Sequence, residues 1–223
     1  MLIQNIFKSR NSTPSARQPT RRPAARLWLE ALEDRSMPSF IGPVTYPAAS
    51  IPPEPPGRLQ DFNGDGYYDY ASLGTNSVTI HLGNGDGTFR AGQTLGISTW
   101  GEGLAVGDFN GDRILDLAVT SALPDGSDGY MDVFQGKGDG TFLFRNTYGL
   151  GGEAYFQPRA VVDLAGNGRD DLVLVGGYGS VDVWLGNADG TLQQGQSFNS
   201  GTPPNVVTVR DLNGDGKPDL VLS

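Results

Sequence analysis

The stretch "DFNGDGYYD" at residues 61–69 alternates acidic or amide side chains with other residues, has Gly at its sixth position and closes on Asp. It nearly recurs as "DFNGDRILD" at 108–116, "DLAGNGRDD" at 163–171 and "DLNGDGKPD" at 211–219. Carboxylates gathered this closely repel one another unless a cation lies between them. Self-similarity at an interval of about 50 residues indicates a repeat protein.

A second signature follows each of the first three stretches: "LGNGDGTF" at 82–89, "QGKGDGTF" at 135–142 and "LGNADGTL" at 185–192. A near-continuous apolar run, such as "LVLVG" at 172–176, leaves each Asp-rich loop, and a strictly alternating strand follows it, as in Val181, Val183 and Leu185. The D-G-T turn predicts a hairpin to a fourth, weaker strand. Four short strands per repeat predict an all-β fold of β-propeller blades, three complete and half of a fourth.

Composition divides the chain near residue 57. Ten of the fifteen Pro fall in residues 1–56, and 32 of the 33 Gly fall from residue 57 onward. We therefore predict a basic leader with a short helix at 1–38, a Pro-rich linker at 39–56 and a repeat domain at 57–223. The repeats are expected near 57–103, 104–158, 159–205 and 206–223, the last of them incomplete.

Charge and composition narrow the classes of function. The net charge is −9, and residues 1–40 are basic, so the repeat domain is strongly acidic. An acidic surface disfavours nucleic acid and anionic lipid and favours cations. The sequence contains no apolar run of about 18 residues, so no transmembrane helix is predicted. The chain has no Cys and a single His, His81, and every clustered carboxylate belongs to the repeat, so we expect a protein that is not an enzyme.

The Asp-rich loops have the pattern of a calcium site. A hard cation such as Ca²⁺ takes roughly six to eight oxygens, which side chains at the first, third, fifth and ninth positions and a carbonyl at the seventh can supply. The predicted ligands are Asp61, Asn63, Asp65, Tyr67 (carbonyl) and Asp69; Asp108, Asn110, Asp112, Ile114 (carbonyl) and Asp116; Asp163, Asn167, Arg169 (carbonyl) and Asp171; and Asp211, Asn213, Asp215, Lys217 (carbonyl) and Asp219. Arg113 replaces the sixth-position Gly of the second loop, and Ala165 removes one ligand from the third.

Two other interpretations of these loops share part of the pattern. An EF-hand needs a Glu at the twelfth position and a helix on each side, whereas strands are predicted here and the twelfth residues are Ser72, Val119, Leu174 and Leu222. The EF-hand is therefore excluded. The remaining alternative is that Asp and Asn only form hydrogen-bonded turns between strands. Magnesium is less suited than calcium because it keeps most of its waters.

The loop at 61–69, followed by a strand and then G-N-G-D-G-T-F, resembles the FG-GAP or VCBS-type repeat of integrin-α-like β-propellers. The resemblance covers residues 57–223. It implies a calcium ion between the first and second strands of each blade, and a non-catalytic role in adhesion or ligand binding outside the cell. A carbohydrate-binding module (lectin) and a truncated remnant of a larger secreted enzyme or surface protein are the alternatives.

The leader carries a second resemblance. The stretch "RLWLEALEDRSMPS" at 26–39 resembles the LEPR-XLL-type N-terminal motif of certain large bacterial surface proteins. Leu29, Glu30, Leu32, Glu33 and Arg35 match that motif, whereas Ser36 and Met37 stand where apolar residues are usual. The resemblance implies a bacterial protein that is secreted or held at the cell surface. An ordinary short amphipathic helix is the alternative.

Strand order predicts where a ligand would bind. If the Asp-rich loops and the D-G-T turns share one rim of the blades, the opposite rim gathers five aromatic residues, Trp100, Tyr130, Tyr155, Phe156 and Tyr178. Exposed aromatic side chains suit the recognition of a sugar or a protein. The alternative is that these side chains fill gaps between blades.

The number of blades raises a further question. Propellers close with roughly four to eight blades, and the repeats supply three and a half. A truncated gene product, a marginally folded partial propeller and the pairing of two chains to complete one ring are the explanations that the sequence leaves open.

Overall fold

The computed structural model describes residues 57–152 and 155–223. All regular structure in these residues is β-strand. The predicted leader helix and the export-like motif at 26–39 lie outside the described residues. Within the described ranges there is no helix that could cross a membrane.

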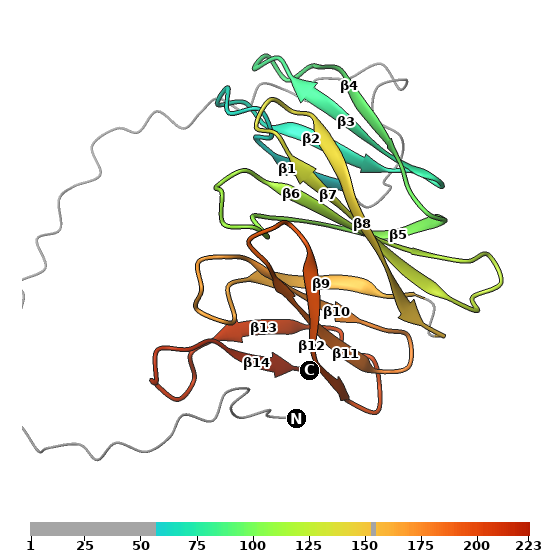
Figure 1. The fold of residues 1–223 in the computed structure, drawn as a ribbon, viewed down its shortest axis with the longest axis vertical. Coiled ribbons are helices and arrows are strands. Elements are labelled where there is room, and N and C mark those ends of the chain that lie inside the picture. The colour runs from blue at the N-terminus through green and yellow to red at the C-terminus, as the bar shows by residue number, and fades with distance from the viewer. Residues whose placement is uncertain (1–56, 153–154) are drawn as a thin grey trace, which may run out of the picture. The chain divides into compact units, whose positions relative to one another are not determined.

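The strands form three four-stranded antiparallel sheets and one two-stranded sheet, each strand pairing with its neighbour in sequence (Figure 1). Sheet one consists of β1 (Gly57–Gln60), β2 (Asp69–Leu73), β3 (Ser77–Gly83) and β4 (Phe89–Gly96). Sheet two consists of β5 (Trp100–Gly107), β6 (Asp116–Ala122), β7 (Gly129–Gly136) and β8 (Phe142–Gly151). Sheet three consists of β9 (Gln157–Val162), β10 (Asp171–Val175), β11 (Ser180–Gly186) and β12 (Leu192–Asn199). The fourth sheet consists of β13 (Val207–Arg210) and β14 (Asp219–Leu222).

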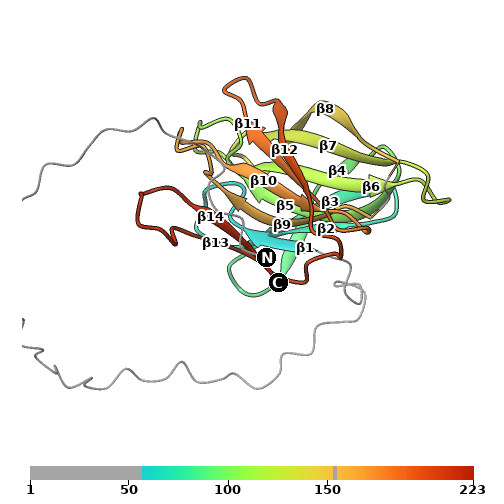
Figure 2. The same ribbon diagram turned by 90° about the horizontal axis from the view of Figure 1, so that it is seen from below.

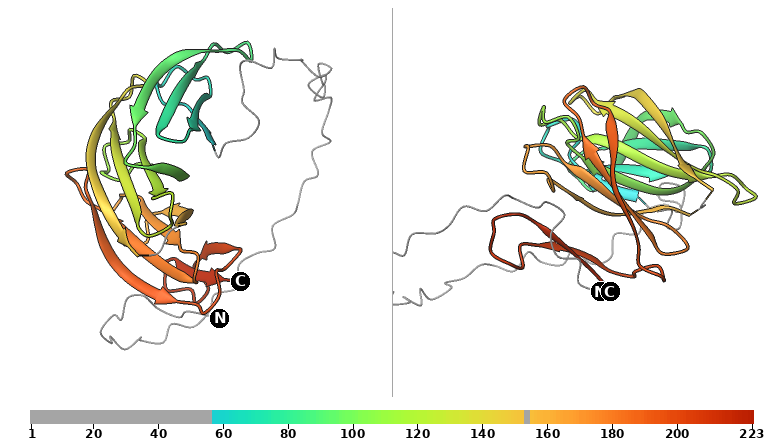
Figure 3. Two further views of the ribbon diagram at one scale, coloured as in Figure 1. Left: turned by 90° about the vertical axis from the view of Figure 1, so that its right-hand side faces the viewer. Right: turned by 60° about the horizontal axis from the view of Figure 1, so that its bottom comes forward.

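The sheets are stacked as the blades of a propeller are. The first strands of successive sheets lie beside one another, because β5 contacts β1 and β9, and β9 also contacts β13. The last strands β4 and β8 contact each other as well. The left view of Figure 3 shows the sheets following one another in sequence order, and Figure 2 looks along this stack from below, so that the sheets overlap. The prediction of an all-β fold with four-stranded antiparallel blades is confirmed.

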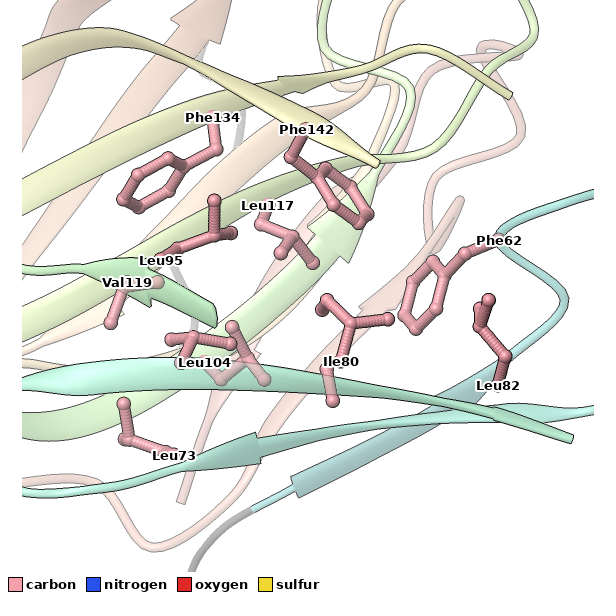
Figure 4. Close-up of a cluster of buried hydrophobic side chains, with 12 residues drawn as sticks. Phe62, Leu73, Ile80, Leu82, Leu95, Leu104, Leu117, Val119, Phe134 and Phe142 are labelled. Atoms are coloured by element: carbon pink, nitrogen blue, oxygen red, sulfur yellow. The ribbon is translucent and has the colours of Figure 1, made fainter. Parts of the chain in front are cut away.

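Apolar side chains fill each space between successive sheets. Between sheets one and two, the rings of Phe62 and Phe142 meet edge to face with centroids 5.5 Å apart, and Leu104 and Phe134 complete the layer (Figure 4). A second cluster, which includes Trp184, joins sheets two and three, and a third joins sheet three to β13 and β14. Each large apolar side chain buried in this way contributes roughly 1.5–3 kcal/mol, so neighbouring sheets stabilise one another.

Burial along the strands explains the apolar patterns of the sequence. Strands β6 and β10 are buried over their whole length because they are covered on both faces, and they correspond to the continuous apolar runs. Strand β3 alternates, and the fourth strands β8 and β12 are mostly exposed. Hydrogen bonds also join the sheets: the Gln93 side chain in β4 pairs with the backbone of Phe142 in β8, at 2.7 and 3.0 Å.

Candidate metal loops

The four Asp-rich loops all join the first strand of a sheet to the second. They lie between β1 and β2, β5 and β6, β9 and β10, and β13 and β14, and we call them loops one to four. The D-G-T turns join the third and fourth strands, so in an antiparallel sheet they lie at the same end as the loops. The predicted arrangement of the two signatures on one rim therefore holds.

The first-position carboxylate holds each loop in a tight coil. In loop one, Asp61 Oδ1 accepts a hydrogen bond from the Gly64 amide at 2.7 Å, and Oδ2 accepts one from the Gly66 amide at 2.9 Å. The sixth-position amide donates to the equivalent oxygen in the other loops, which are headed by Asp108, Asp163 and Asp211. The local sequence thus folds four times in the same way.

The third and fifth positions add further turns to the coil. Asn63 Oδ1 accepts a hydrogen bond from the Asp65 amide, and Asp65 Oδ1 accepts one from the Tyr67 amide, each at 2.9 Å. The same bonds recur in loops two and four through Asn110, Asp112, Asn213 and Asp215. In loop three only the fifth-position bond forms, from the Arg169 amide to Asn167 Oδ1, because Ala165 has no side-chain acceptor.

The coil requires left-handed backbone at its sixth position. Gly66, Gly168 and Gly216 have φ between 78° and 86°, a conformation that costs glycine little. Loop two has Arg113 there, with φ of 68°. The sequence departs from the repeat at this position while the backbone does not, so loop two holds a strained residue.

Replacing Arg113 with Gly should raise the free energy of unfolding by roughly 0.5–1 kcal/mol, because the left-handed conformation penalises a side chain but not glycine. Urea denaturation at constant m-value measures the change. Arg113→Gln removes the same charge but keeps the side chain, so it should leave the stability within about 0.5 kcal/mol of the parent. Equal stabilisation by both substitutions would assign the gain to charge and contradict backbone strain.

The ninth-position carboxylates are buried and bind backbone amides. Asp69 has no exposed surface; its Oδ2 accepts a hydrogen bond from the Phe62 amide at 2.9 Å, and its Oδ1 accepts one from the Gly83 amide at 2.8 Å. Asp116 and Asp171 make the equivalent pair of bonds, and Asp219 bonds the Leu212 amide. Each closing Asp therefore ties the start of its loop to its own sheet.

The glycine that ends the third strand completes this contact. Gly83, Gly136 and Gly186 donate the amide that the closing Asp accepts. A Cβ atom on Gly136 would lie 2.1 Å from the carbonyl oxygen of Leu115 in loop two, and one on Gly186 would lie 2.6 Å from that of Asp170 in loop three. The loop backbone thus rests directly on the end of the third strand, where only glycine fits. This contact was not predicted from the sequence.

Loops two and three also touch each other. The Asp170 amide donates to the Asp108 carbonyl at 2.8 Å, and the Asp108 amide donates to Asp170 Oδ2 at 2.9 Å. Burial raises the pKa of Asp170, and the charges of Asp108 and Asp163 raise it further, against the opposing effect of the hydrogen bond from the Asp108 amide. Two acidic loops of neighbouring sheets therefore share one negatively charged region.

The pKa of Asp116, the closing residue of loop two, is raised from 3.8 to about 7. Burial is the main cause, and the charges of Asp112 and Asp108 add to it, while hydrogen bonds from the Gly136 and Phe109 amides oppose it. The folded state therefore holds this proton more tightly than the unfolded chain. The resulting stabilisation is complete below a pH of about 4 and is lost as the pH rises through about 7.

In the presence of chelator, the Asp116 contribution to the free energy of unfolding should therefore fall as the pH rises from about 4 to about 7. Asp116→Asn removes the titrating group and should flatten that part of the curve. Urea denaturation of both proteins across this pH range measures the difference. Parallel curves for the parent and the variant would contradict the assignment of this slope to Asp116.

The donor chemistry of the loops fits a hard cation. Among the described residues, no three His, Cys, Asp or Glu side chains converge on a point that could hold an ion. The three Asp side chains predicted as ligands in each of loops one, two and four are therefore not gathered around one point, and Asn side chains and backbone carbonyls would have to complete each set with oxygen. An ionised carboxylate also offers about four lone-pair sites, so the hydrogen bonds in the loops do not exhaust its capacity to bind an ion.

Three of the predicted rim aromatics are exposed at the end opposite the loops. Trp100 is 50% exposed, Tyr155 56% and Tyr178 74%, while Tyr130 is half-buried. Trp100 begins β5, Tyr155 lies just before β9 and Tyr178 lies in the turn between β10 and β11. The expectation for Phe156 was wrong: it is 3% exposed and packs in the cluster between sheets two and three.

The family model for FG-GAP-like repeats matches residues 61–119 and 163–222, which together make up more than half of the chain. No curated protein matches the chain. The matched segments begin at Asp61 and Asp163, the first residues of loops one and three. The fold and the loops define an all-β repeat protein of stacked antiparallel sheets. The chain belongs to the FG-GAP-like repeat family.

Two solved structures are similar to the chain. One is an Agrocybe aegerita lectin, described as recognising non-reducing terminal N-acetylglucosamine, with a TM-score of 0.49, 28% identity and coverage of 73% of this chain and 44% of the lectin chain. The other is a Photorhabdus luminescens Tc holotoxin pore, with a TM-score of 0.40, 18% identity and coverage of 74% of this chain and 9% of that chain. The chain spans less than half the length of either.

Proposed function

We propose that this chain is a calcium-binding, non-catalytic repeat protein that binds a protein or glycan ligand at the cell surface or outside the cell. The observation that carries the calcium proposal is the repeated coil of the Asp-rich loops, which presents oxygen donors on one rim of every sheet. Loops one, two and four hold a full set of side-chain donors. Loop three lacks one of them at Ala165 and is the weakest site.

Isothermal titration calorimetry of the full chain, first freed of metal with chelator, tests the calcium proposal. We expect calcium to bind at up to four sites, one for each loop. Asp211→Ala should remove one site, because Asp211 heads loop four. Asp189→Ala is the matched control, since Asp189 is an exposed carboxylate of a D-G-T turn and lies outside the loops. Absence of binding at millimolar calcium would contradict the proposal.

The exposed aromatic residues support ligand binding at the opposite rim. Trp100 and Tyr155 are equivalent in the repeat, since each lies eight residues before the first Asp of its loop. Tyr155 also has a φ of 73°, which is strained for an aromatic residue. Backbone strain of this kind clusters at binding and active sites, and exposed aromatic side chains suit the recognition of a ligand. The proposed ligand is a glycan or a protein segment.

A glycan array probed with the full chain tests this second part. Binding to a glycan should be lost in Trp100→Ala and in Tyr155→Ala. It should persist in Tyr68→Ala, because Tyr68 is an equally exposed aromatic residue in loop one, on the other rim. Unchanged binding in both rim variants would exclude the rim. No binding to any glycan on the array, together with binding to a surface protein, would favour adhesion over a lectin function.

The proposed location and assembly rest on separate features. Location outside the cell rests on the family and on the motif at 26–39. In the described residues β14 pairs only with β13, so its other edge presents unpaired backbone groups that a second copy could pair with. We include self-association in the proposal. Light scattering that gives a clean monomer mass at micromolar concentration would remove it.

A further inference from the structure

A cavity of about 220 Å³ lies among the first strands of sheets one, two and three. Arg58 and Gln60 line it from β1, and Arg159 lines it from β9. Small apolar residues, among them Val106 of β5 and Val161 of β9, line the rest of it. This cavity is separate from the rim aromatics, and none of the predicted calcium ligands lines it.

A β-bulge places Arg159 at the cavity. In the pairing of β9 with β10, Ala160 lies opposite Val173 and Pro158 lies opposite Leu174, so Arg159 is the extra residue between them. A bulge re-aims the side chain of its extra residue, and Pro158 has no amide to donate to the sheet at this point. The regular pleat is broken at the one residue of β9 that brings a charge to the cavity.

The charge of the cavity is opposite to that of the protein. The chain has a net charge of −9 and 25 acidic residues, yet none of the described residues that line the cavity is acidic. Among the residues that the structure describes, Arg58 donates only to the neighbouring Gly57 carbonyl, at 3.3 Å. Arg159 makes no hydrogen bond or ion pair with any residue that the structure describes. A guanidinium has five donors, so both arginines have donors left for a ligand.

We propose that this cavity binds a small ligand through a carboxylate, and that an acidic sugar of the uronic acid class fits it best. Guanidinium groups bind carboxylates through two parallel hydrogen bonds. The cavity is smaller than the roughly 300–1,000 Å³ of sites for drug-sized ligands, which suits a single sugar ring. Gln60 can bond a hydroxyl group, while Val106 and Val161, which are partly buried, offer apolar contact to the ring.

Calorimetric titration of the full chain with glucuronate tests the inference. Binding in the millimolar range is expected, with glucose, which lacks the carboxylate, failing to bind. Arg58→Gln and Arg159→Gln should each weaken glucuronate binding by about tenfold or more, since each removes a charge-assisted contact. Arg90→Gln is the matched control, because Arg90 is an exposed arginine on β4 outside the cavity, and this variant should bind as the parent does.

Several outcomes would overturn the inference. No binding of glucuronate, equal binding of glucose, or unchanged affinity in both arginine variants would each do so. Sulfate and acetate are titrated as comparison anions, and a preference for sulfate over both glucuronate and acetate would also overturn it. Thermal melts establish that the variants are folded, which is expected because both arginines are exposed. The inference does not rest on calcium or on the rim aromatics. Repeating the glucuronate titration in chelator distinguishes failure of this inference from failure of the calcium proposal.

Discussion

Asp171→Ala should lower the free energy of unfolding by about 3 kcal/mol or more, because each buried donor left without a partner costs roughly 1–3 kcal/mol. The Asp171 carboxylate accepts hydrogen bonds from the Leu164, Ala165 and Gly186 amides, at 2.8, 3.0 and 2.9 Å. It has no exposed surface. Loop three is also the weakest metal candidate, so the decrease in the free energy of unfolding measures the lost hydrogen bonds more than lost calcium binding. Urea denaturation in chelator measures it.

Two controls separate the hydrogen bonds from other effects. Asp171→Asn keeps the size of the side chain but replaces one accepting oxygen with an NH₂ group, which cannot accept a hydrogen bond from a backbone amide. This variant should therefore show most of the decrease in stability. Asp189→Ala removes an exposed carboxylate that bonds only Thr191, and should cost about 1 kcal/mol or less. A loss in Asp171→Ala no larger than that in Asp189→Ala would contradict the role of Asp171 in bracing the loop.

Gly136→Ala should destabilise the protein by about 3 kcal/mol, the upper part of the usual range for overpacking a rigid site. The new methyl group would lie 2.1 Å from the Leu115 carbonyl oxygen and 3.1 Å from Ile114 Cγ2. Backbone cannot rotate away as a flexible side chain can, so strand β7 and loop two would have to separate. That movement would also lengthen the hydrogen bond from the Gly136 amide to Asp116.

Gly149→Ala in the same sheet is the matched control. Gly149 is exposed on β8, and a Cβ atom there meets nothing within 4 Å. This substitution should change the stability by less than about 0.5 kcal/mol. Chemical denaturation of the two variants under one condition makes the comparison. Equal effects would show that close approach at Gly136 is not what requires glycine.

The sequence was sufficient for the architecture because the pattern repeats. Each apolar run, alternating strand and turn signature recurs at nearly constant spacing. A strand that is ambiguous in one repeat can therefore be predicted from the same pattern in the other repeats. The fully buried strand β10 reads as "DLVLV" and the half-buried β3 as "SVTIHLG", and each has the burial that its pattern predicts. Only sheet stacking and register depend on contacts that local patterns do not encode.

The errors and omissions at the site have physical causes. Tyr155 and Phe156 are adjacent, but Tyr155 has left-handed backbone with φ of 73°, so local pattern does not predict that Tyr155 is exposed and Phe156 is buried. The contact between Asp69 and Gly83 arises from the pairing of β2 with β3, which joins residues 14 apart. A detectable signal did exist, since Gly ends the alternating strand in all three complete repeats.

A thermal melt of the full chain in millimolar calcium and in chelator tests the central claim most directly. A ligand that binds only the folded state at about one hundred times its Kd stabilises by roughly 2.7 kcal/mol per site. If the Asp-rich loops hold calcium, the midpoint should rise by many degrees in calcium, and magnesium at the same concentration should produce a smaller rise. A cooperative melt with the same midpoint in calcium and in chelator would mean that the loops are hydrogen-bonded turns and would contradict the account.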